Sequence, residues 1–425
     1  MGMSTTRAGE FSPATRVRRI RESPSSAASA RARDLKGQGR TIIDFTVGEP
    51  DFDTPRNVKD AAIAAIEAGQ TKYTAVNGTP ALRDAIRARM LRTSGIVYTD
   101  AQITIGGGGK QVIYMAFAAS LDPGDEVIIP TPYWVSYPDM VLANDGSPVI
   151  VSTRPDSAYK LTPAALEAAI TDRTKWLVLN APSNPVGVLY TPEDLVALAE
   201  VLERHPHVWV LSDEIYDEIL YTGRPFTGIA AAAPGIRSRV LTVNGVSKTY
   251  AMTGWRLGYG VGDPKLIAAI NKLQSQVSSC PSSISQAAAV EALTGDQSFI
   301  ADCVAAYRTR RDLALERIGA IAGLSPIAPD GAFYLYVGCG PLIGRETAAG
   351  NRLRSDEDVT LFLLEEAGVA VIQGSAYGTA PFFRMSFATS ESEINAGADA
   401  IAAAVAGLRP PTPASADARA ETNAR

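Results

Sequence analysis

The regular alternation of two residue patterns constrains the fold of this chain more than any other feature. Short apolar, β-branched runs predict strands at Thr41–Val47, Gln102–Ile105, Glu126–Pro130, Trp176–Asn180, Val208–Ser212, Val240–Asn244 and Leu257–Val261. Apolar residues at helical spacing predict helices that include residues 57–69, 79–93, 110–120, 191–204, 264–275 and 299–321. Strands that alternate with helices favour an α/β fold, in which helices cover a largely parallel sheet.

Polar residues follow three of these strands at the point where the apolar run ends. Trp176–Leu179 leads into residues 180–185, which contain Asn180 and Asn184. Val208–Leu211 leads into Ser212-Asp213-Glu214-Ile215-Tyr216, and Val240–Val243 leads into Asn244-Gly245-Val246-Ser247-Lys248. Each stretch alone is compatible with an ordinary loop. Because ligands bind beyond the carboxyl ends of parallel strands, the three together predict a site with an Asn, an Asp, a Tyr and a Lys.

Composition excludes several classes of protein. Of the 425 residues, 46% are apolar and 20% charged, as in a globular protein with a large core. The net charge of −5 argues against a nucleic-acid-binding protein. Both histidines lie in His205-Pro206-His207, which excludes a His-rich zinc site, and we expect no metal. Three scattered cysteines favour a reducing compartment, so we predict a cytoplasmic protein. No apolar run is long enough to predict a membrane span.

The two ends of the chain differ from the rest in composition. Residues 1–40 hold nine Lys or Arg and three Asp or Glu, and their Arg, Ser and Ala content is somewhat like that of a transit peptide. The acidic residues weaken that interpretation, and without an apolar region a secretory signal is not expected. Residues 409–425 are rich in Pro, Ala and polar residues, which predicts a disordered tail.

Lys248 lies in a largely apolar run, eight residues before Arg256. Apolar surroundings and a nearby cation lower the pKa of a lysine, and a neutral amine can form an imine with an aldehyde. A solvated surface lysine is the alternative, but the glycines and aromatic residues that flank Lys248 argue against a surface stretch.

Ser247-Lys248 followed by Met252–Tyr259 closely resembles the pyridoxal-phosphate lysine motif of class I aminotransferases, and more narrowly the bacterial aspartate aminotransferase branch of fold type I. The resemblance extends from about Arg16 to Leu408. Further matching segments are Val47–Pro55, Lys72–Thr74, Gly108–Gln111, Asp122–Glu126, Pro132–Pro138, Ser183–Pro185, Ser212–Tyr216 and Phe383–Ser386. The ordered set of segments is far more specific than any one of them.

The resemblance implies roles for the residues at the strand ends. Lys248 would hold pyridoxal 5'-phosphate as an internal imine and would then shuttle the substrate proton. Asp213 would face the pyridine nitrogen and keep it protonated. Asn184 and Tyr216 would hydrogen-bond the 3-oxygen of the ring, and Trp134 would stack on its face. Trp134 and Asn184 would also contact the substrate.

The phosphate and the substrate carboxylate each need donors. Residues 106–110, which include Gly108, Gly109 and Lys110, lie between a strand and a helix, as in an anion-binding helix start, although a flexible turn is the plain alternative. Arg256 would add a bidentate contact and Ser247 a hydroxyl. By resemblance, Arg384 clamps the substrate α-carboxylate and Gly48 donates a backbone N–H to it. A buried salt bridge is the alternative for Arg384. By resemblance Tyr73 reaches the phosphate of the neighbouring subunit, which implies a homodimer.

The chain departs from the family in its N-terminal arm. Aspartate-preferring members often carry a Lys before a Pro-Ser segment, where this chain has Arg21-Glu22-Ser23-Pro24-Ser25. Arg21 could bind a distal carboxylate, whereas Glu22 could repel one, and a solvated Arg21 is an equal alternative. Lys110 is a second candidate for that carboxylate.

These expectations define one enzyme. We predict an α/β enzyme of fold type I, with an arm at 1–30, a small α+β domain from 31–54 and 305–408, and a large cofactor-binding domain at 55–304. It would move an amino group between an L-amino acid, with aspartate as first guess, and a 2-oxo acid such as 2-oxoglutarate. The alternatives are an aromatic or prephenate aminotransferase, or a C–S lyase, on the same scaffold. We expect no nucleic-acid or membrane partner.

Overall fold

The computed structural model describes residues 11–21 and 24–410, and it divides into two compact units. The larger unit comprises residues up to Ser23, Glu49–Arg308 and Pro329–Phe333. The smaller comprises Pro24–Gly48, Thr309–Ala328 and Tyr334 onward. The sequence-based limits of the domains differ from these units by several residues at the junctions. In particular, residues 24–30 of the predicted arm belong to the smaller unit. Most of the predicted tail, residues 411–425, lies outside the described residues.

A seven-stranded sheet forms the centre of the larger unit, in the order β2-β8-β7-β6-β5-β3-β4. The strands are β2 Ile103–Gly106, β3 Glu126–Pro130, β4 Ser147–Val151, β5 Thr174–Asn180, β6 Trp209–Asp213, β7 Val240–Gly245 and β8 Gly258–Val261. Only β8 is antiparallel to its neighbours β2 and β7. The expectation of a largely parallel sheet is therefore confirmed. The sequence analysis missed the edge strand β4.

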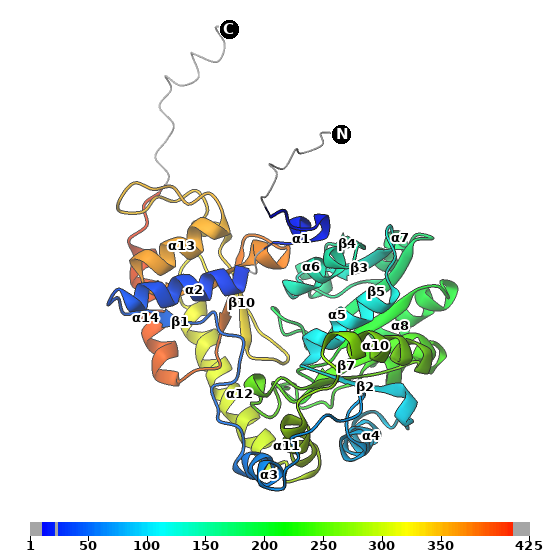
Figure 1. Cartoon of the computed structure of the whole chain (residues 1–425). Coiled ribbons are helices and arrows are strands. Elements are labelled where there is room, and N and C mark those ends of the chain that lie inside the picture. Colours follow the sequence, from blue (N-terminus) through cyan, green and yellow to red (C-terminus); the bar gives the residue numbers. More distant parts are fainter. Residues whose placement is uncertain (1–10, 22–23, 411–425) are drawn as a thin grey trace. The chain divides into compact units, whose positions relative to one another are not determined.

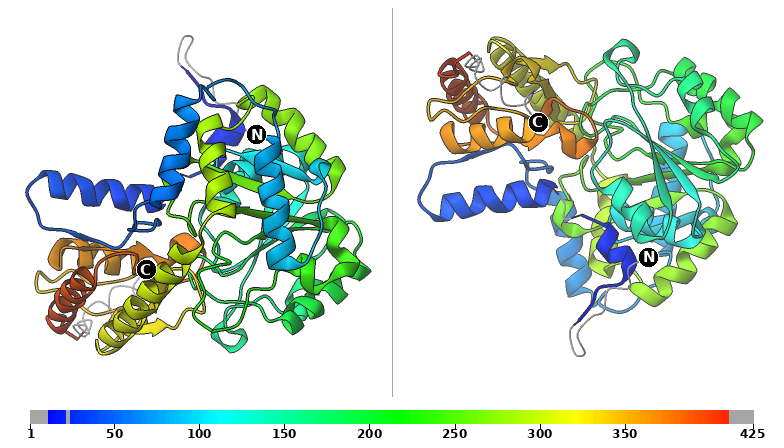
Figure 2. Two further views of the ribbon diagram at one scale, coloured as in Figure 1. Left: turned by 90° about the horizontal axis from the view of Figure 1, so that it is seen from below. Right: turned by 90° about the horizontal axis from the view of Figure 1, so that it is seen from above.

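Helices cover both faces of this sheet (Figures 1 and 2). They are α3 Arg56–Glu67, α4 Pro80–Ser94, α5 Gly109–Ser120, α6 Ser136–Ala143, α7 Pro163–Ala169, α8 Pro192–Arg204, α9 Ile229–Ala232, α10 Pro264–Val277 and α11 Ser283–Thr294. A short helix, α1 Thr15–Arg19, precedes them, and α12 Ser298–Gly319 continues into the smaller unit. The predicted helices agree with α3, α4, α5, α8, α10 and α12 to within about two residues.

The strands are apolar on both faces because both faces are buried. Along β3, Ile128 packs in one apolar cluster, whereas Val127 and Ile129 pack in another. On β5, Leu177 packs in the first of these clusters and Val178 in the second. Successive strand residues point to opposite faces, so a continuous apolar run is what a sheet between two helical layers needs.

The smaller unit contains a four-stranded antiparallel sheet in the order β12-β13-β10-β9 and a separate pair of short parallel strands, β1 and β11. Its elements are α2 Pro24–Gly37, β1 Ile43–Asp44, β9 Ser325–Ile327, β10 Tyr334–Gly338, α13 Asp356–Glu366, β11 Val369–Ala370, β12 Ile372–Gln373, β13 Phe382–Ser386 and α14 Glu391–Ala406. Only the two residues of β1 form a strand within the predicted run 41–47. Over the described residues, no helix combines the length and the apolar character needed to cross a membrane.

Candidate active site

The carboxyl ends of the parallel strands gather the predicted residues at one edge of the large sheet. Asp213 ends β6, Lys248 follows β7, and Asn184 follows β5. Neighbouring strands are in register there, with Asn180 opposite Asp213 and Asp213 opposite Val243. Strand β8 runs the other way, so it begins at this edge with Gly258, opposite both Gly106 and Gly245. Arg256, just before β8, is brought to the same edge.

Asp213 is buried and held by a tyrosine that the sequence analysis did not assign. Tyr137, in the first turn of α6, donates a hydrogen bond of 2.6 Å from its hydroxyl to Oδ2 of Asp213. The backbone N–H of Ile215 donates to Oδ1 at 3.4 Å. Burial raises the pKa of Asp213 to about 6, although the bond from Tyr137 and the charge of Lys248 act to lower it. A cationic partner would therefore stabilise the charged form of this carboxyl.

The amine of Lys248 lies near two aromatic rings. Its Nζ is 6.0 Å from the ring centroid of Tyr216 and 5.9 Å from that of Phe333. The Tyr216 and Phe333 rings contact each other edge to face, with centroids 5.5 Å apart. Ser247 beside it is buried. Lys248 itself is half-buried, and an amine beside aromatic rings suits a nucleophile more than a surface charge.

Asn180 ties the loop after β5 to the end of β6. Its Nδ2 donates to the carbonyl of Asp213 at 3.0 Å, and its Oδ1 accepts the backbone N–H of Asn184 at 2.8 Å. Asn184 itself is buried. One amide side chain thus fixes the loop of Asn184 relative to Asp213.

The glycine run before α5 forms a cradle that has no room for side chains. A Cβ on Gly108 would lie 2.6 Å from Nη2 of Arg256, and Gly108 has a φ of +96°. A Cβ on Gly258 would lie 2.3 Å from the backbone nitrogen of Gly109. In the first turn of α5, the amides of Gln111 and Val112 donate to the carbonyl of Gly108, whereas those of Gly109 and Lys110 precede the first bonds of the helix. The latter two amides are donors suited to an anion.

Two cations flank this cradle. Arg256 donates to the carbonyls of Thr253 at 2.9 Å and Gly107 at 3.2 Å. Burial and the charge of Arg256 lower the pKa of Lys110. Lys110 places its Nζ 4.8 Å from the ring centroid of Trp134, and Trp134 packs edge to face on Tyr137. Two like charges at a helix N-terminus favour a bound anion, because the anion relieves their mutual repulsion.

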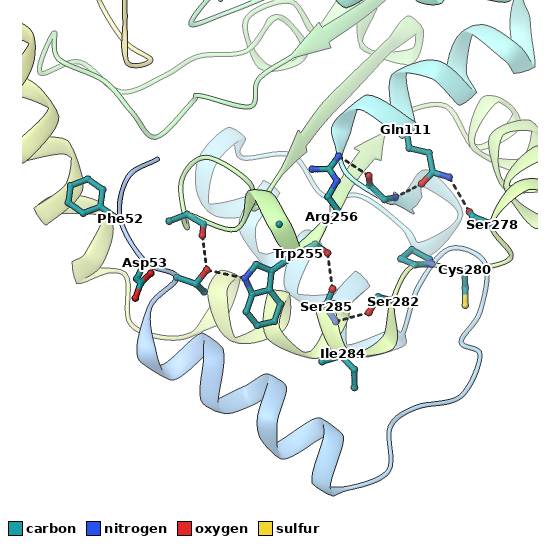
Figure 3. A pocket seen from close by; sticks show the side chains of 15 residues that line it. Phe52, Asp53, Gln111, Trp255, Arg256, Ser278, Cys280, Ser282, Ile284 and Ser285 are labelled. Carbon is teal, nitrogen blue, oxygen red and sulfur yellow. Dashed lines mark hydrogen bonds between the residues drawn. The ribbon is translucent and has the colours of Figure 1, made fainter. Parts of the chain in front are cut away.

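A pocket of about 700 Å³ opens beside the cradle (Figure 3). Its lining includes Gly107, Gln111 and Arg256, and Figure 3 shows the bond of 3.1 Å from Gln111 Nε2 to Ser278 Oγ. On the other side, Trp255 Nε1 donates to Thr54 Oγ1 at 3.0 Å. The pocket has the size of a small-molecule site and reaches the cradle, but Lys248 and Asp213 are not in its lining.

Gly48 and Arg384 lie in the smaller unit, where Tyr334 links them. Arg384, on β13, is 3% exposed and donates from Nη2 to the carbonyl of Thr46 at 2.7 Å. Its guanidinium lies 4.2 Å from the ring centroid of Tyr334 and 5.4 Å from that of Tyr377. A Cβ on Gly48 would lie 3.1 Å from the hydroxyl of Tyr334. A stacked guanidinium beside a glycine backbone suits recognition of a carboxylate.

Two predicted residues lie apart from the strand ends of the larger unit. Tyr73, between α3 and α4, is 89% exposed and lines a separate pocket of about 460 Å³. Arg21 lies in the N-terminal segment that packs on α6, where its backbone N–H donates to Oδ1 of Asp139 at 3.3 Å. Arg19 pairs with Asp145 at 2.7 Å in the same segment.

Comparisons with known proteins agree on one family. The family model described as "Aminotransferase class I and II" matches residues 40–401. The chain is similar to an aspartate aminotransferase of Rhizobium meliloti, with 50% identity over 94% of this chain and 98% of that one. It is equally similar, at 50% identity over 92% and 98%, to an aspartate/prephenate aminotransferase of Cereibacter sphaeroides.

Solved structures give the same result. The crystal structure of the Rhizobium meliloti aspartate aminotransferase matches with a TM-score of 0.92 and 50% identity, over 94% of this chain and all of that one. The Thermus thermophilus aspartate aminotransferase with maleate matches with a TM-score of 0.86 and 39% identity, over 93% of this chain and all of that one.

Proposed function

The chain belongs to the class I and II aminotransferases, of fold type I, and we propose that it binds pyridoxal 5'-phosphate on Lys248 and uses an acidic amino acid as a substrate. Family and relatives establish that it is an aminotransferase, which moves an amino group between an amino acid and a 2-oxo acid. The cofactor, the roles of individual residues and the substrates are the proposed part.

The residues at the sheet edge fit this cofactor. Gly108 and Gly109 would present backbone N–H groups to a phosphate at the N-terminus of α5, and Arg256 and Lys110 would supply positive charge. Asp213 is a fully buried carboxyl of raised pKa that would be stabilised by a ring N–H⁺. When bound, pyridoxal phosphate supplies an aldehyde that condenses with amines and a ring that withdraws electrons from the carbon beside the amine.

Each side chain then has a distinct task. Lys248 would hold the cofactor, and its amine would take and return the proton at the substrate Cα. Tyr137 keeps Asp213 in place and charged. Tyr216 and Asn184 would hold the ring through hydrogen bonds, and Ser247 and Arg256 would hold the phosphate. Trp134 would pack against the ring. The observation that carries the proposal is the buried Tyr137–Asp213 pair at the same sheet edge as Lys248.

The smaller unit supplies the proposed clamp for the substrate α-carboxylate. Arg384 would bind it through its guanidinium fork, which Thr46 and Tyr334 hold in place. The backbone N–H of Gly48 would donate to the same carboxylate. This role agrees with the absence of a side chain at Gly48, where a Cβ would press against Tyr334.

Aspartate and 2-oxoglutarate are the first proposed substrates. The similar enzymes from Rhizobium meliloti and Thermus thermophilus are named for aspartate, and the latter was solved with maleate, a dicarboxylate. Either Arg21 or Lys110 would read the distal carboxylate. Asp139 bonds to the backbone of Arg21 and would compete for its charge. Prephenate is the second candidate, since the similar Cereibacter sphaeroides enzyme is named for both.

We also propose a homodimer with shared sites. Tyr73 is almost fully exposed in the single chain. We expect such exposure for a tyrosine that reaches into a neighbouring subunit. Sedimentation of the purified protein tests this assembly. Mixing Lys248→Ala chains with Tyr73→Phe chains should restore activity above that of either alone, because one site of the hybrid is intact.

Reduction of the protein with borohydride tests the cofactor. We expect a yellow protein, a stable cofactor adduct on Lys248 by peptide mass analysis, and no turnover in Lys248→Ala. A protein that stays colourless after added pyridoxal phosphate would overturn the proposal.

A panel of amino donors with 2-oxoglutarate as acceptor tests the substrates. A lyase would instead release pyruvate and ammonia without an acceptor. Arg21→Ala and Lys110→Met are then compared on aspartate and on an uncharged donor. The residue that reads the distal carboxylate is the one whose loss weakens aspartate selectively.

A further inference from the structure

A buried ion pair links helix α4 to the segment that follows β6, next to the proposed catalytic residue Tyr216. Arg89 of α4 donates from Nη2 to both oxygens of Asp217, at 2.9 and 2.8 Å, and from Nη1 to the hydroxyl of Tyr259 at 3.0 Å. The side chains of Arg89 and Asp217 are 2% and 5% exposed. Asp217 directly follows Tyr216 and lies four residues after Asp213.

Asn244 extends this link to the loop that bears Lys248. Its Nδ2 donates to Oδ2 of Asp217 at 2.9 Å, and its Oδ1 accepts the backbone N–H of Gly245 at 2.7 Å. Asn244 lies near the end of β7, four residues before Lys248. The carboxylate of Asp217 thus accepts hydrogen bonds from Arg89 on helix α4 and from Asn244 on strand β7, which leads into the loop of Lys248.

The pair is costly to bury and is therefore a weak source of stability. Removing two charges from water is costly, and apolar replacements of such pairs are often neutral or stabilising. Nε of Arg89 is buried and has no hydrogen-bond partner among the described residues, which adds to the cost. What the pair provides in return is a fixed geometry, because Nη2 of Arg89 contacts both oxygens of Asp217 while Nη1 contacts the hydroxyl of Tyr259.

We propose that Arg89, Asp217 and Asn244 form a positioning network that sets the placement of Tyr216 and Asp213 relative to Lys248. This inference rests on the proposed function of those three residues. None of the network residues touches the substrate in this proposal; they act through the loops that they hold.

The decisive variant is Arg89→Met/Asp217→Leu, which removes both charges of the buried pair together. Glu218 loses its contact with Arg89, but its side chain is partly exposed to solvent. We expect it to fold with a melting temperature close to that of the wild type and to form the borohydride adduct on Lys248. We expect kcat to fall by about tenfold to a hundredfold, as for a displaced catalytic group. The pH midpoint of the bound cofactor's absorbance should also move, because Tyr216 would no longer be held at its present distance from Lys248.

Other ionisable groups near Arg89 could also affect the pH midpoint. Oε1 of Glu218 lies 3.4 Å from Nη2 of Arg89, and Tyr259 and Tyr250 interact electrostatically with the Arg89 charge. Burial raises the pKa of Tyr259 well above its usual value and that of Tyr250 to about 12, so neither tyrosine titrates near neutral pH.

Two further variants keep the test decisive. Asn244→Ala cuts only the link to the lysine loop and should shift the same midpoint with a smaller loss of kcat. Arg173→Met/Glu126→Leu removes an ion pair at the amino ends of β3 and β5, away from the carboxyl ends that carry the site. It should match the wild type in kcat and in the pH midpoint. A loaded, folded Arg89→Met/Asp217→Leu protein with wild-type kcat and midpoint would overturn the positioning role. A wild type without a lysine adduct would overturn the proposed function, and the inference with it.

Discussion

Tyr137 and Asp213 form a hydrogen bond of 2.6 Å in a part of the larger unit where both side chains are fully buried. The tyrosine comes from the first turn of α6 and the aspartate from the end of β6, 76 positions apart in the chain. Burial raises the pKa of the tyrosine well above its usual value, so it remains a donor at every physiological pH.

Replacing Tyr137 by Phe removes a side-chain donor that lowers the pKa of Asp213. We expect the affinity for pyridoxal phosphate and kcat each to fall by about tenfold or more, since hydrogen bonds to charged groups contribute about 1.5–3 kcal/mol. The loss should be larger at pH 6 than at pH 8, where more of the carboxyl is charged. Equilibrium titration with cofactor at both pH values measures it. Tyr190→Phe, at a buried tyrosine that accepts from Leu161, is the control.

Asp213 should make the cofactor-free protein less stable as pH rises. Its pKa is about 6 in the fold against 3.8 unfolded, so the folded state holds the proton over that interval and the unfolded state does not. The contribution of Asp213 to the free energy of unfolding is therefore greatest below about pH 4 and is lost by about pH 6. The change is up to about 3 kcal/mol. Asp213→Asn lacks the carboxyl and therefore lacks this pH-dependent part of the stability. Urea unfolding of both proteins at two pH values tests it, and parallel pH dependence would contradict the raised pKa.

Gly108→Ala should damage the phosphate cradle. The new methyl group would lie 2.6 Å from Nη2 of Arg256, which must then move away from the anion. We expect the dissociation constant for pyridoxal phosphate to rise by about tenfold to a hundredfold. Gly124→Ala is a matched control, because Gly124 has a similar φ of +101° but meets no described atom within 4 Å. If both variants lost affinity equally, backbone strain and not the contact with Arg256 would be the cause.

Arg384→Ala should raise KM for both amino and oxo acids, with a smaller effect on kcat. Loss of a bidentate carboxylate contact typically costs a few kcal/mol, or about a hundredfold in KM. Arg384→Lys should recover little, since an ammonium reproduces neither the fork nor the stack on Tyr334. Steady-state kinetics measure both. Arg345→Ala, which loses a bond to the carbonyl of Leu408 in the same unit, should leave KM unchanged. Unchanged affinity in Arg384→Ala would refute the clamp.

Local patterns were sufficient to predict most of the large sheet. Helix α8 begins where Thr191 caps it and Pro192 follows, and both signals act within one turn. The edge strand β4 was missed because its five residues are only partly buried and carry a serine and a proline, which weaken the strand pattern. In the smaller unit, the two-residue strands β1, β11 and β12 are too short to produce any periodicity.

By itself, the sequence determined that strands and helices alternate, and it located the polar residues that end the strands, since propensity and periodicity depend on near neighbours. Only the tertiary structure decided that β8 enters between β2 and β7 in reverse, which brings Arg256 to the glycine cradle. It also decided that Tyr137 reaches Asp213 and that Arg89 reaches Asp217. These pairings join residues more than seventy positions apart, and they follow from burying both faces of the sheet, which no local pattern specifies.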